Sequence, residues 1–212
     1  MILVVYFDAF HKDLEKQLKN HNIPFQLVKY ADLEHYKPTK AITPFRTQSA
    51  QRVCHPAMRD ALSPFSSLRE TAPKGGVLNE KRCKTIIISG SKQRILRTND
   101  FPLLDTYMTQ DVHIIGICFG FQYLAFKTGG KVVEGPLFKG RRTVRTTRET
   151  NSEHLYFNHH DRVIDLPDEW TVVQRIDGFI NIAATKKWIG FQFHPEKDDE
   201  HFRHYVLPFL KV

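Results

Sequence analysis

Apolar residues recur along the chain with two different spacings. Short continuous apolar runs, such as Ile2–Phe7, are typical of strands buried on both faces of a parallel sheet. After this run, Phe10, Leu14 and Leu18 recur every four residues with charged residues between them, which predicts an amphipathic helix. Strands alternating with helices in this way predict an α/β fold. The other runs predicted to be buried strands are Phe25–Val28, Thr85–Ile88 and Val112–Ile115.

The pattern in the second half of the chain predicts further helices and shorter strands. Asp100 is expected to cap one helix, and the apolar-periodic stretch Phe121–Phe126 predicts another that ends at the glycine pair beginning with Gly129. A final helix is predicted from about Asp198, because apolar residues recur at helical spacing from Phe202 onward. The shorter strands are predicted at Lys131–Val133, Thr143–Arg145, Thr171–Val173, Ile180–Ala183 and Trp188–Phe193.

Residues 37–82 differ in composition from the rest of the chain. Five of the 11 prolines fall here, and nine Lys or Arg residues against three Asp or Glu leave a local excess of six positive charges. Long unpatterned loops are uncommon inside compact domains and tend to be lids, docking surfaces or disordered segments. We interpret the stretch as a basic, Pro-rich insertion at about 37–82, with a short helix expected near Ala57–Leu62. Docking to an acidic partner and a solvated loop are both open interpretations.

Composition limits the class of protein. With 212 residues, 41% hydrophobic and 25% charged, the chain is expected to form a single domain, 1–212, with a sizeable core. No apolar stretch approaches the roughly 20 residues needed to span a bilayer, and Met1–Phe10 is interpreted as a strand and not as a signal peptide. Three cysteines without paired or metal-like spacing fit a reducing compartment, so a cytoplasmic protein is expected. The net charge of +8 is accompanied by no nucleic-acid motif, so no nucleic-acid partner is expected.

The heptapeptide Gly116–Gln122 has the spacing of a nucleophile elbow. It follows an apolar run and precedes a helical pattern, which places Cys118 at the apex of a strand–turn–helix unit. Glycines two residues before and after the cysteine permit a turn in which a Cβ would collide with neighbouring backbone. The first amides of the helix favour negative charge, so they would stabilise a thiolate. A buried structural cysteine between incidental glycines is the alternative interpretation.

The hexapeptide Phe191–Glu196 supplies candidate partners for a cysteine nucleophile. Because a residue before proline is held in an extended conformation, Pro195 fixes His194 at the end of a strand, and Glu196 can fold back behind the imidazole. A nucleophilic cysteine needs such a base to hold the thiolate and a carboxylate to orient the base. The alternative is a strand-end histidine followed by an exposed glutamate.

Two polar segments are further candidates for the site. Ser89–Ser91 follows the third strand and is a candidate oxyanion loop, since thioester chemistry needs two backbone donors for a tetrahedral oxygen. The amide of Phe119 is expected to be one donor, and an amide of Gly90 or Ser91 the other. The cluster Asn158–Asp161 admits a metal interpretation, but its adjacent histidines would point in different directions and no further ligand cluster is evident. No metal is therefore expected.

Together these motifs resemble the triad-type (class I) glutamine amidotransferases. The resemblance rests on Gly-x-Cys-x-Gly-x-Gln at 116–122 followed by His-Pro-Glu at 194–196, and it covers about Thr85–Glu196. It implies a flavodoxin-like three-layer α/β/α sandwich with a mostly parallel central sheet and a small antiparallel portion. It also implies a glutaminase that needs no cofactor, forms a γ-glutamyl thioester and releases ammonia for a separate synthetase.

The resemblance assigns roles residue by residue. Cys118 would be the nucleophile, His194 the general base and acid, and Glu196 the orienting carboxylate. The segment Asn158–Val163 is similar to the Ser-His-Gly-Asp-x-Val segment of the GMP synthetase glutaminase, which holds the amino-acid end of glutamine. The residues that the resemblance implies in substrate binding are Gln122, His159 and Asp161.

Three departures from the family pattern leave other functions open. The family's Ser-Gly-Gly-Pro loop is Ser89–Lys92 here, His160 replaces a small residue of the pocket loop, and the insertion at 37–82 has no counterpart. Ser-Gly-Ser together with Gly-Ile-Cys-Phe-Gly also looks like the γ-glutamyl peptidases of the same superfamily, which act on glutathione-like compounds. A catalytically silent member that binds a partner and a Cys-dependent α/β-hydrolase are further alternatives. The expected substrate is glutamine or another γ-glutamyl small molecule.

Overall fold

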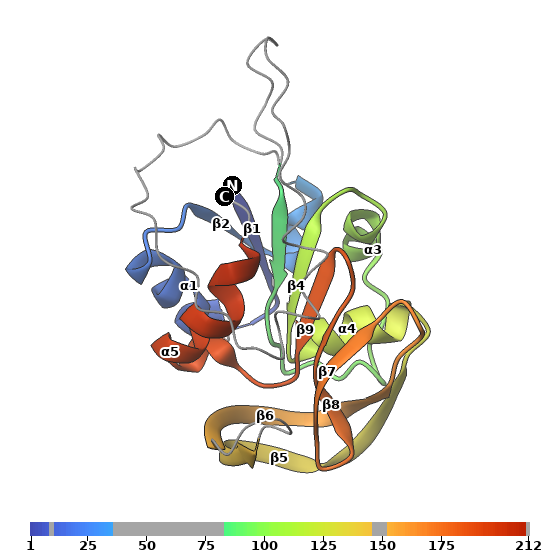
Figure 1. Cartoon of the computed structure of the whole chain (residues 1–212). Coiled ribbons are helices and arrows are strands. Elements are labelled where there is room, and N and C mark those ends of the chain that lie inside the picture. The colour runs from blue at the N-terminus through green and yellow to red at the C-terminus, as the bar shows by residue number, and fades with distance from the viewer. Residues whose placement is uncertain (9–10, 36–82, 146–151, 211–212) are drawn as a thin grey trace.

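The computed structural model describes residues 1–8, 11–35, 83–145 and 152–210. A seven-stranded sheet has the order β2-β1-β3-β4-β9-β8-β7, and a separate antiparallel ribbon, β5–β6, lies across one end of it (Figure 1). The strands are β1 Ile2–Tyr6, β2 Phe25–Lys29, β3 Thr85–Ile88, β4 His113–Ile117, β5 Lys131–Arg145, β6 Ser152–Asp165, β7 Thr171–Ile176, β8 Phe179–Ala184 and β9 Trp188–Phe191. The helices are α1 His11–Asn20, η1 Tyr30–His35, α3 Pro102–Met108, α4 Phe119–Lys127, η2 Pro195–Lys197, α5 Asp199–His201, η3 Phe202–Val206 and η4 Leu207–Phe209.

The sheet is mostly parallel, as the alternation of strands and helices along the chain predicts. In the parallel part, β1 lies between β2 and β3, so that Ile2 pairs with both Phe25 and Thr85. The pairs β3–β4 and β4–β9 are also parallel, whereas β9–β8 and β8–β7 are antiparallel. The predicted α/β fold with an antiparallel portion is therefore confirmed. The predicted insertion and its short helix lie outside the described residues.

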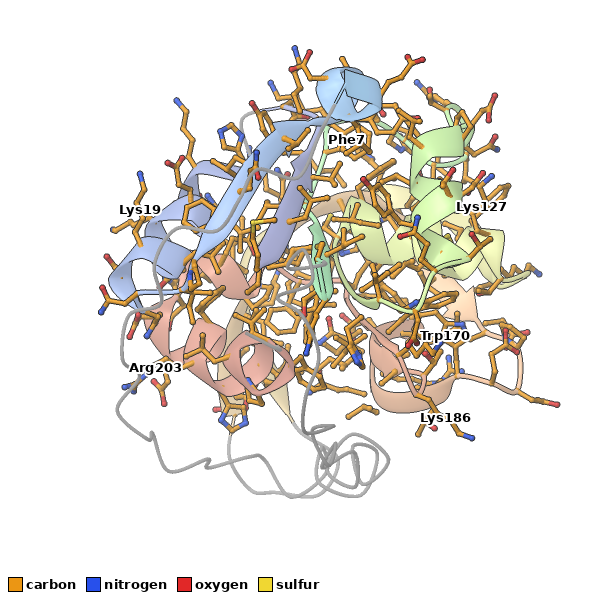
Figure 2. The ribbon with its side chains drawn as sticks, turned by 90° about the horizontal axis from the view of Figure 1, so that it is seen from above. Phe7, Lys19, Lys127, Trp170, Lys186 and Arg203 are labelled. Carbon is orange, nitrogen blue, oxygen red and sulfur yellow. The ribbon has the colours of Figure 1, made fainter. Side chains whose placement is uncertain are left out.

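Helices cover both faces of this sheet. Residues of β1 alternate between two cores: Ile2 and Val4 pack with α1 and the C-terminal helices, while Leu3 and Val5 pack with α3 and α4. Figure 2 shows α1 and α5 on one side of the sheet and α3 and α4 on the other. Because each face of the sheet needs apolar cover, the central strands β1 and β3 are apolar without alternation.

Three local predictions differ from the structure. Asp100 does not cap a helix: α3 begins at Pro102, whose fixed φ and missing N–H suit the first helical turn. The two short strands predicted at 131–133 and 143–145 belong to one strand, β5, whose pairing with β6 shifts register between Glu134 and Phe138. The sequence pattern does not predict strand β6, which is observed at Ser152–Asp165.

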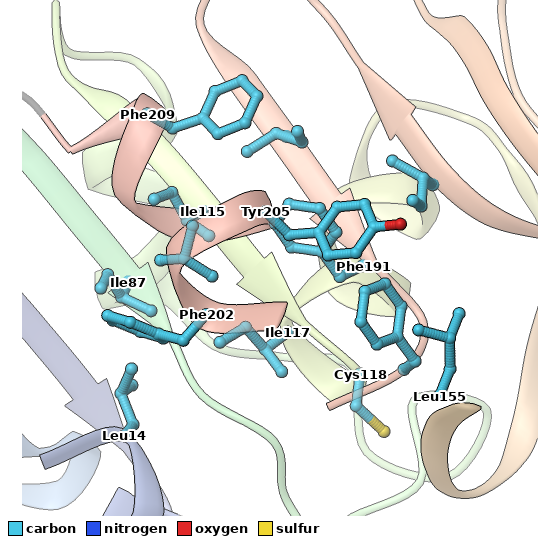
Figure 3. Close-up of a cluster of buried hydrophobic side chains, with 14 of the residues drawn as sticks. Leu14, Ile87, Ile115, Ile117, Cys118, Leu155, Phe191, Phe202, Tyr205 and Phe209 are labelled. Carbon is cyan, nitrogen blue, oxygen red and sulfur yellow. The ribbon is translucent and has the colours of Figure 1, made fainter. Parts of the chain in front are cut away.

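The predicted C-terminal helix begins where expected. The side chain of Asp198 accepts hydrogen bonds from the backbone amides of Glu200 and His201, as an N-cap does. The chain then continues through the π-helical turn η3, which buries Phe202 and Tyr205 against the sheet (Figure 3). No helix among the described residues is long and apolar enough to cross a membrane.

Candidate active site

Cys118 lies in the tight turn that joins β4 to α4. Its backbone is left-handed, with a φ of +53°, which is uncommon for a residue that has a Cβ. A Cβ on Gly116 would lie 2.7 Å from the backbone of Gly120, and a Cβ on Gly120 would lie 2.3 Å from the carbonyl oxygen of Ile88. Both positions therefore require glycine because of close backbone approach. The turn has the geometry of a nucleophile elbow, and Figure 3 shows Cys118 beside the buried core.

His194 and Glu196 form a buried pair after β9. The backbone N–H of His194 donates to the carbonyl oxygen of Tyr156 at 2.8 Å, which fixes the segment. Pro195 opens the 3₁₀ turn η2, and this turn returns Glu196 to the imidazole. Nδ1 of His194 lies 2.7 Å from Oε1 of Glu196, and both side chains are 2% exposed or less. Because the carboxylate accepts this hydrogen bond, Nδ1 carries the proton.

The surroundings of His194 have opposing effects on its charge. Burial, the largest influence, lowers the pKa of His194 because the imidazolium loses its hydration. The charges of Glu196 and Cys118, with hydrogen bonds to both, outweigh burial and raise the pKa to about 10. Gly90 lies against the same ring, since a Cβ there would be 2.8 Å from Cε1 of His194 and 3.8 Å from Cβ of Cys118. The candidate nucleophile, base and oxyanion loop therefore meet at one place.

The candidate oxyanion loop is anchored by a residue that the sequence pattern does not mark. Oδ2 of Asp8 accepts hydrogen bonds from the backbone N–H of Lys92 at 2.7 Å and from Oγ of Ser91 at 3.3 Å. The hydroxyl of Ser91 in turn accepts the backbone N–H of Gln93 at 3.0 Å. The other candidate donor, the amide of Phe119, belongs to the first residue of α4, directly after the cysteine.

A pocket of about 180 Å³ opens beside Cys118. The side-chain amide of Gln122 donates to the carbonyl oxygen of Asp161 at 2.6 Å, and Nδ1 of His159 donates to the same oxygen at 3.1 Å. Burial, helped by the nearby charge of Arg162, lowers the pKa of His159 to about 3, so this imidazole is neutral near pH 7. The candidate residues in the pocket wall are Ser91, Cys118, Gln122, His159 and Asp161.

Arg94 also lines this pocket, although no sequence motif singles it out. Its Nε donates to Oδ1 of Asp161 at 2.7 Å, and its Nη2 contacts the same oxygen. Nη2 also lies 3.1 Å from a carboxylate oxygen of Glu134. The Asp161 side chain is 1% exposed and the Arg94 side chain 17% exposed. The hydrogen bond to Asp161 is the main cause that raises the pKa of Arg94, so the pair is an ion pair.

The candidate residues thus gather at the carboxyl ends of β3, β4 and β9, beside the inward face of β6. This edge is where ligands bind in open α/β sheets. Among the described residues, no group of three or more His, Cys, Asp or Glu side chains is arranged to hold a metal ion. The two adjacent histidines point differently, since His159 is buried while His160 lies partly exposed at the pocket wall.

Residues 48–210 match the class I glutamine amidotransferase family, and the chain belongs to this family. The glutamine-hydrolyzing GMP synthase of Bacillus subtilis (strain 168) is 31% identical over 124 residues, which are 53% of this chain and 24% of that protein. The corresponding protein of Vibrio atlanticus (strain LGP32) is 29% identical over 122 residues, again 24% of its length. The chain therefore aligns with about a quarter of the length of these curated relatives.

Solved structures share the fold. A candidate GMP synthase subunit from Thermoplasma acidophilum has a TM-score of 0.61 at 17% identity, covering 92% of this chain and 85% of that one. A glutamine amidotransferase from Thermotoga maritima has a TM-score of 0.55 at 14% identity, covering 98% and 81%. At these identities the likeness establishes the α/β fold and leaves the chemistry to be argued from the site.

Proposed function

We propose that the chain is a glutaminase of the amidotransferase type, which hydrolyses the side-chain amide of glutamine through a thioester on Cys118. The observation that carries the proposal is the buried His194–Glu196 pair beside a cysteine at the apex of an elbow. A buried ion pair adds little to the stability of a protein, because the cost of desolvation offsets the attraction between the charges. Stability alone therefore does not account for this pair. Next to a cysteine with left-handed backbone geometry, the pair has the arrangement that nucleophilic catalysis requires.

In the proposed acylation step, the thiolate of Cys118 attacks the amide carbon of the glutamine side chain. The carbonyl oxygen takes the negative charge, and backbone amides of Phe119 and of the Gly90–Ser91 loop stabilise it. His194, protonated, gives its proton to the leaving nitrogen. The C–N bond breaks, ammonia leaves, and the γ-glutamyl group remains on the sulfur as a thioester.

In the proposed hydrolysis step, a water molecule attacks the thioester carbon. His194, now neutral, takes a proton from this water, so that one residue acts as acid and then as base. The C–S bond breaks, glutamate leaves, and the thiolate–imidazolium pair is restored. Glu196 holds the imidazole by its Nδ1 proton and stabilises its positive charge in both steps.

The pocket wall supports recognition of the amino-acid end of the substrate. Gln122 and His159 converge on the carbonyl oxygen of Asp161 and thereby fix the backbone of β6 beside the cysteine. The carboxylate of Asp161 is suited to receive an ammonium group, since Oδ2 is buried and has no hydrogen-bond partner among the described residues. The proposed substrate-binding residues are therefore those implied by the family resemblance.

We propose further that residues 1–212 act as one amidotransferase domain and that the ammonia is used by a separate synthetase. The relatives with which the chain aligns are GMP synthases, which makes such a partner plausible for this chain. The basic segment 37–82 carries six excess positive charges and is proposed to dock an acidic partner surface. Docking of this kind weakens as salt rises, because screening shortens the reach of the charges.

One observation favours a γ-glutamyl peptidase as the second candidate. Ser91 stands where the amidotransferase loop has a glycine, and Asp8 anchors it within the chain. A loop fixed from within needs no partner to complete it, as suits a hydrolase that works alone on glutathione-like compounds.

A comparison of substrates with and without a partner tests these proposals. The assays measure release of ammonia and glutamate from glutamine and, in parallel, cleavage of glutathione. The wild type and Cys118→Ser are compared. Each protein is assayed alone and with candidate synthetases, over a series of salt concentrations. Glutamine hydrolysis that a synthetase accelerates at low salt supports the amidotransferase. Fast, partner-independent cleavage of glutathione would assign the peptidase. Equal rates for the wild type and Cys118→Ser would remove both.

A further inference from the structure

Arg94 and Asp161 form an ion pair in the pocket wall that leaves hydrogen-bonding capacity on both sides. Arg94 uses Nε and Nη2 on Asp161 and Glu134, and no hydrogen bond or ion pair engages its Nη1 among the described residues. Asp161 receives Arg94 on Oδ1 only, while Oδ2 is buried without a partner in the same part of the chain. Both groups line the same pocket as Cys118.

The unused groups have opposite preferences. A buried carboxylate oxygen without a donor is costly, so a ligand that brings an N–H group or an ammonium to Oδ2 of Asp161 is stabilised. A guanidinium held in place by a buried carboxylate has already lost most of its side-chain freedom, and its planar N–H groups fit a second carboxylate. The pair therefore offers one place for a cation and, next to it, one for a carboxylate.

We propose that Arg94 binds the free α-carboxylate of the γ-glutamyl substrate and is the residue that makes this carboxylate a requirement. Asp161 takes the neighbouring α-ammonium, so that four charges alternate in sign along the pocket wall. The inference rests on the proposed hydrolysis at Cys118 and adds the requirement that the substrate end in an unmodified amino-acid group. N-terminal γ-glutamyl compounds and glutamine satisfy this requirement, whereas amides and esters of the α-carboxylate do not.

Other groups in the pocket are less suited to this role. His159 is neutral near pH 7, because burial lowers its pKa to about 3. Lys92 also lines the pocket, but its residue is exposed, so its charge is largely hydrated. Arg94 is only 17% exposed, and a contact made in such a partly dehydrated place is stronger than the same contact in water.

The test compares substrates that differ by one charged group. The wild type, Arg94→Gln, Arg94→Lys and Arg97→Gln are assayed with L-glutamine, with its α-carboxamide, and with 5-amino-5-oxopentanoate, which keeps the carboxylate and lacks the ammonium. Where the wild type prefers γ-glutamyl p-nitroanilide, the same two changes are made to that substrate. Arg97 is the matched control, since it lies on the same segment, is exposed and does not line the pocket.

We expect the wild type to favour glutamine over its α-carboxamide by about 10- to 100-fold in kcat/KM, as for a charge-assisted hydrogen bond left unmade. Arg94→Gln should bring this ratio near one while the preference over 5-amino-5-oxopentanoate persists. Arg94→Lys, which keeps the charge without the planar fork, should fall between, and Arg97→Gln should match the wild type.

Two results would overturn the inference. A wild type that hydrolyses glutamine and its α-carboxamide equally well needs no carboxylate-binding residue, whatever the variants do. An Arg94→Gln protein that loses both preferences to the same extent would show that Arg94 acts only by holding Asp161. If Arg94→Gln does not fold, the wild-type ratio and Arg94→Lys decide. These failures differ from failure of the proposed hydrolysis itself, in which no γ-glutamyl compound is cleaved and Cys118 carries no adduct.

Discussion

The carboxylate of Asp8, next to the end of β1, accepts a 2.7 Å hydrogen bond from the backbone amide of Lys92 in the loop that follows β3. Since β1 and β3 are neighbours in the sheet, this contact joins the ends of two parallel strands. The hydroxyl of Ser91 reaches the same carboxylate oxygen and also accepts the amide of Gln93. A side chain outside every recognisable motif thus holds the loop that lies against His194.

Replacement of this anchor is expected to affect turnover more than binding. We predict that Asp8→Ala lowers kcat by roughly 10-fold, about 1.4 kcal/mol in the barrier, with a smaller change in KM, because the loop would no longer hold its amides at one position. Steady-state kinetics on the preferred γ-glutamyl substrate measure both constants. Asp32→Ala, at an exposed acid on η1, is the control and should leave both unchanged. A rise in KM at unaltered kcat would contradict a role in transition-state stabilisation.

Covalent labelling separates Cys118 from the other described cysteine. We predict that an electrophilic glutamine analogue modifies Cys118 and spares Cys83, as read by peptide mass spectrometry. Burial raises the pKa of the Cys83 thiol, so it holds little thiolate near neutral pH. Cys118 lies at the first turn of α4, with a buried histidine close by. Cys54 lies outside the described residues and is mapped in the same experiment, and a label on Cys54 or Cys83 in its place would remove the nucleophile assignment.

The two partners of the cysteine are expected to differ in their effects. His194→Ala should abolish turnover, since proton transfer by a positioned side chain is worth about 10²- to 10⁴-fold. Glu196→Gln should reduce it less, because the amide oxygen can still accept the Nδ1 proton. Glu196→Gln should also shift the part of the pH–rate profile that reports His194 to lower pH. The charge of Glu196 is the main influence that raises the pKa of His194, whereas burial lowers it. An unshifted profile would mean that Glu196 does not act on the imidazole.

The central parallel strands β1, β3 and β4 follow from sequence because nearly all of their residues are buried. Thr85–Ile88 is predicted and observed with the same bounds, since its four residues are all buried. The sequence pattern does not predict strand β6, and the reason is physical. Its inward positions are Leu155, Phe157, His159, Asp161 and Val163, so two polar residues interrupt the apolar alternation at the pocket.

The candidate site shows the same division between local and distant information. Gly116, Cys118 and Gly120 can be recognised as site residues from the sequence, because one turn contains all three. Asp8 and Arg94 cannot be recognised in this way, because their partners are distant in the sequence. Asp8 contacts Lys92, which lies 84 residues away, and Arg94 contacts Asp161, which lies 67 residues away. Contacts of this kind depend on the strand order, which local patterns do not give.

Close packing of the elbow helix gives a prediction about stability. We expect Gly120→Ala to destabilise the protein by roughly 1–3 kcal/mol, as for overpacking, because the new Cβ would lie 2.3 Å from the carbonyl oxygen of Ile88. Gly129→Ala is the comparison: its Cβ would meet nothing within 4 Å, but its φ of +88° costs about 1 kcal/mol in backbone strain. Urea unfolding of both variants measures the difference. A smaller loss of stability in Gly120→Ala than in Gly129→Ala would show that α4 can move away from β3.

His159 supplies a test of the buried pocket through acid stability. Burial is the main cause that lowers the pKa of His159 to about 3, whereas an unfolded chain has an ordinary value of about 6.5. Between these pH values the unfolded state binds a proton that the folded state does not. The free energy of unfolding should therefore fall as the pH falls from about 6.5 to 3, by up to about 1.4 kcal/mol per pH unit from this group.

Replacement of His159 removes the group that would titrate. His159→Gln should lower stability at pH 7, where the buried imidazole packs against Phe138 and Phe179, but should flatten the acid limb between pH 6.5 and 3. His154→Gln, at an exposed position of the same strand, should leave the limb as steep as in the wild type. Because the pKa of His194 is raised, its linkage runs the other way: stability is lost as pH rises from about 6.5 to 10, outside this window. Chemical unfolding at pH 4, 5, 6 and 7 measures how the free energy of unfolding depends on pH in all three proteins. If His159→Gln loses stability with falling pH as steeply as the wild type, this imidazole is hydrated and the pocket wall around Asp161 is open to water.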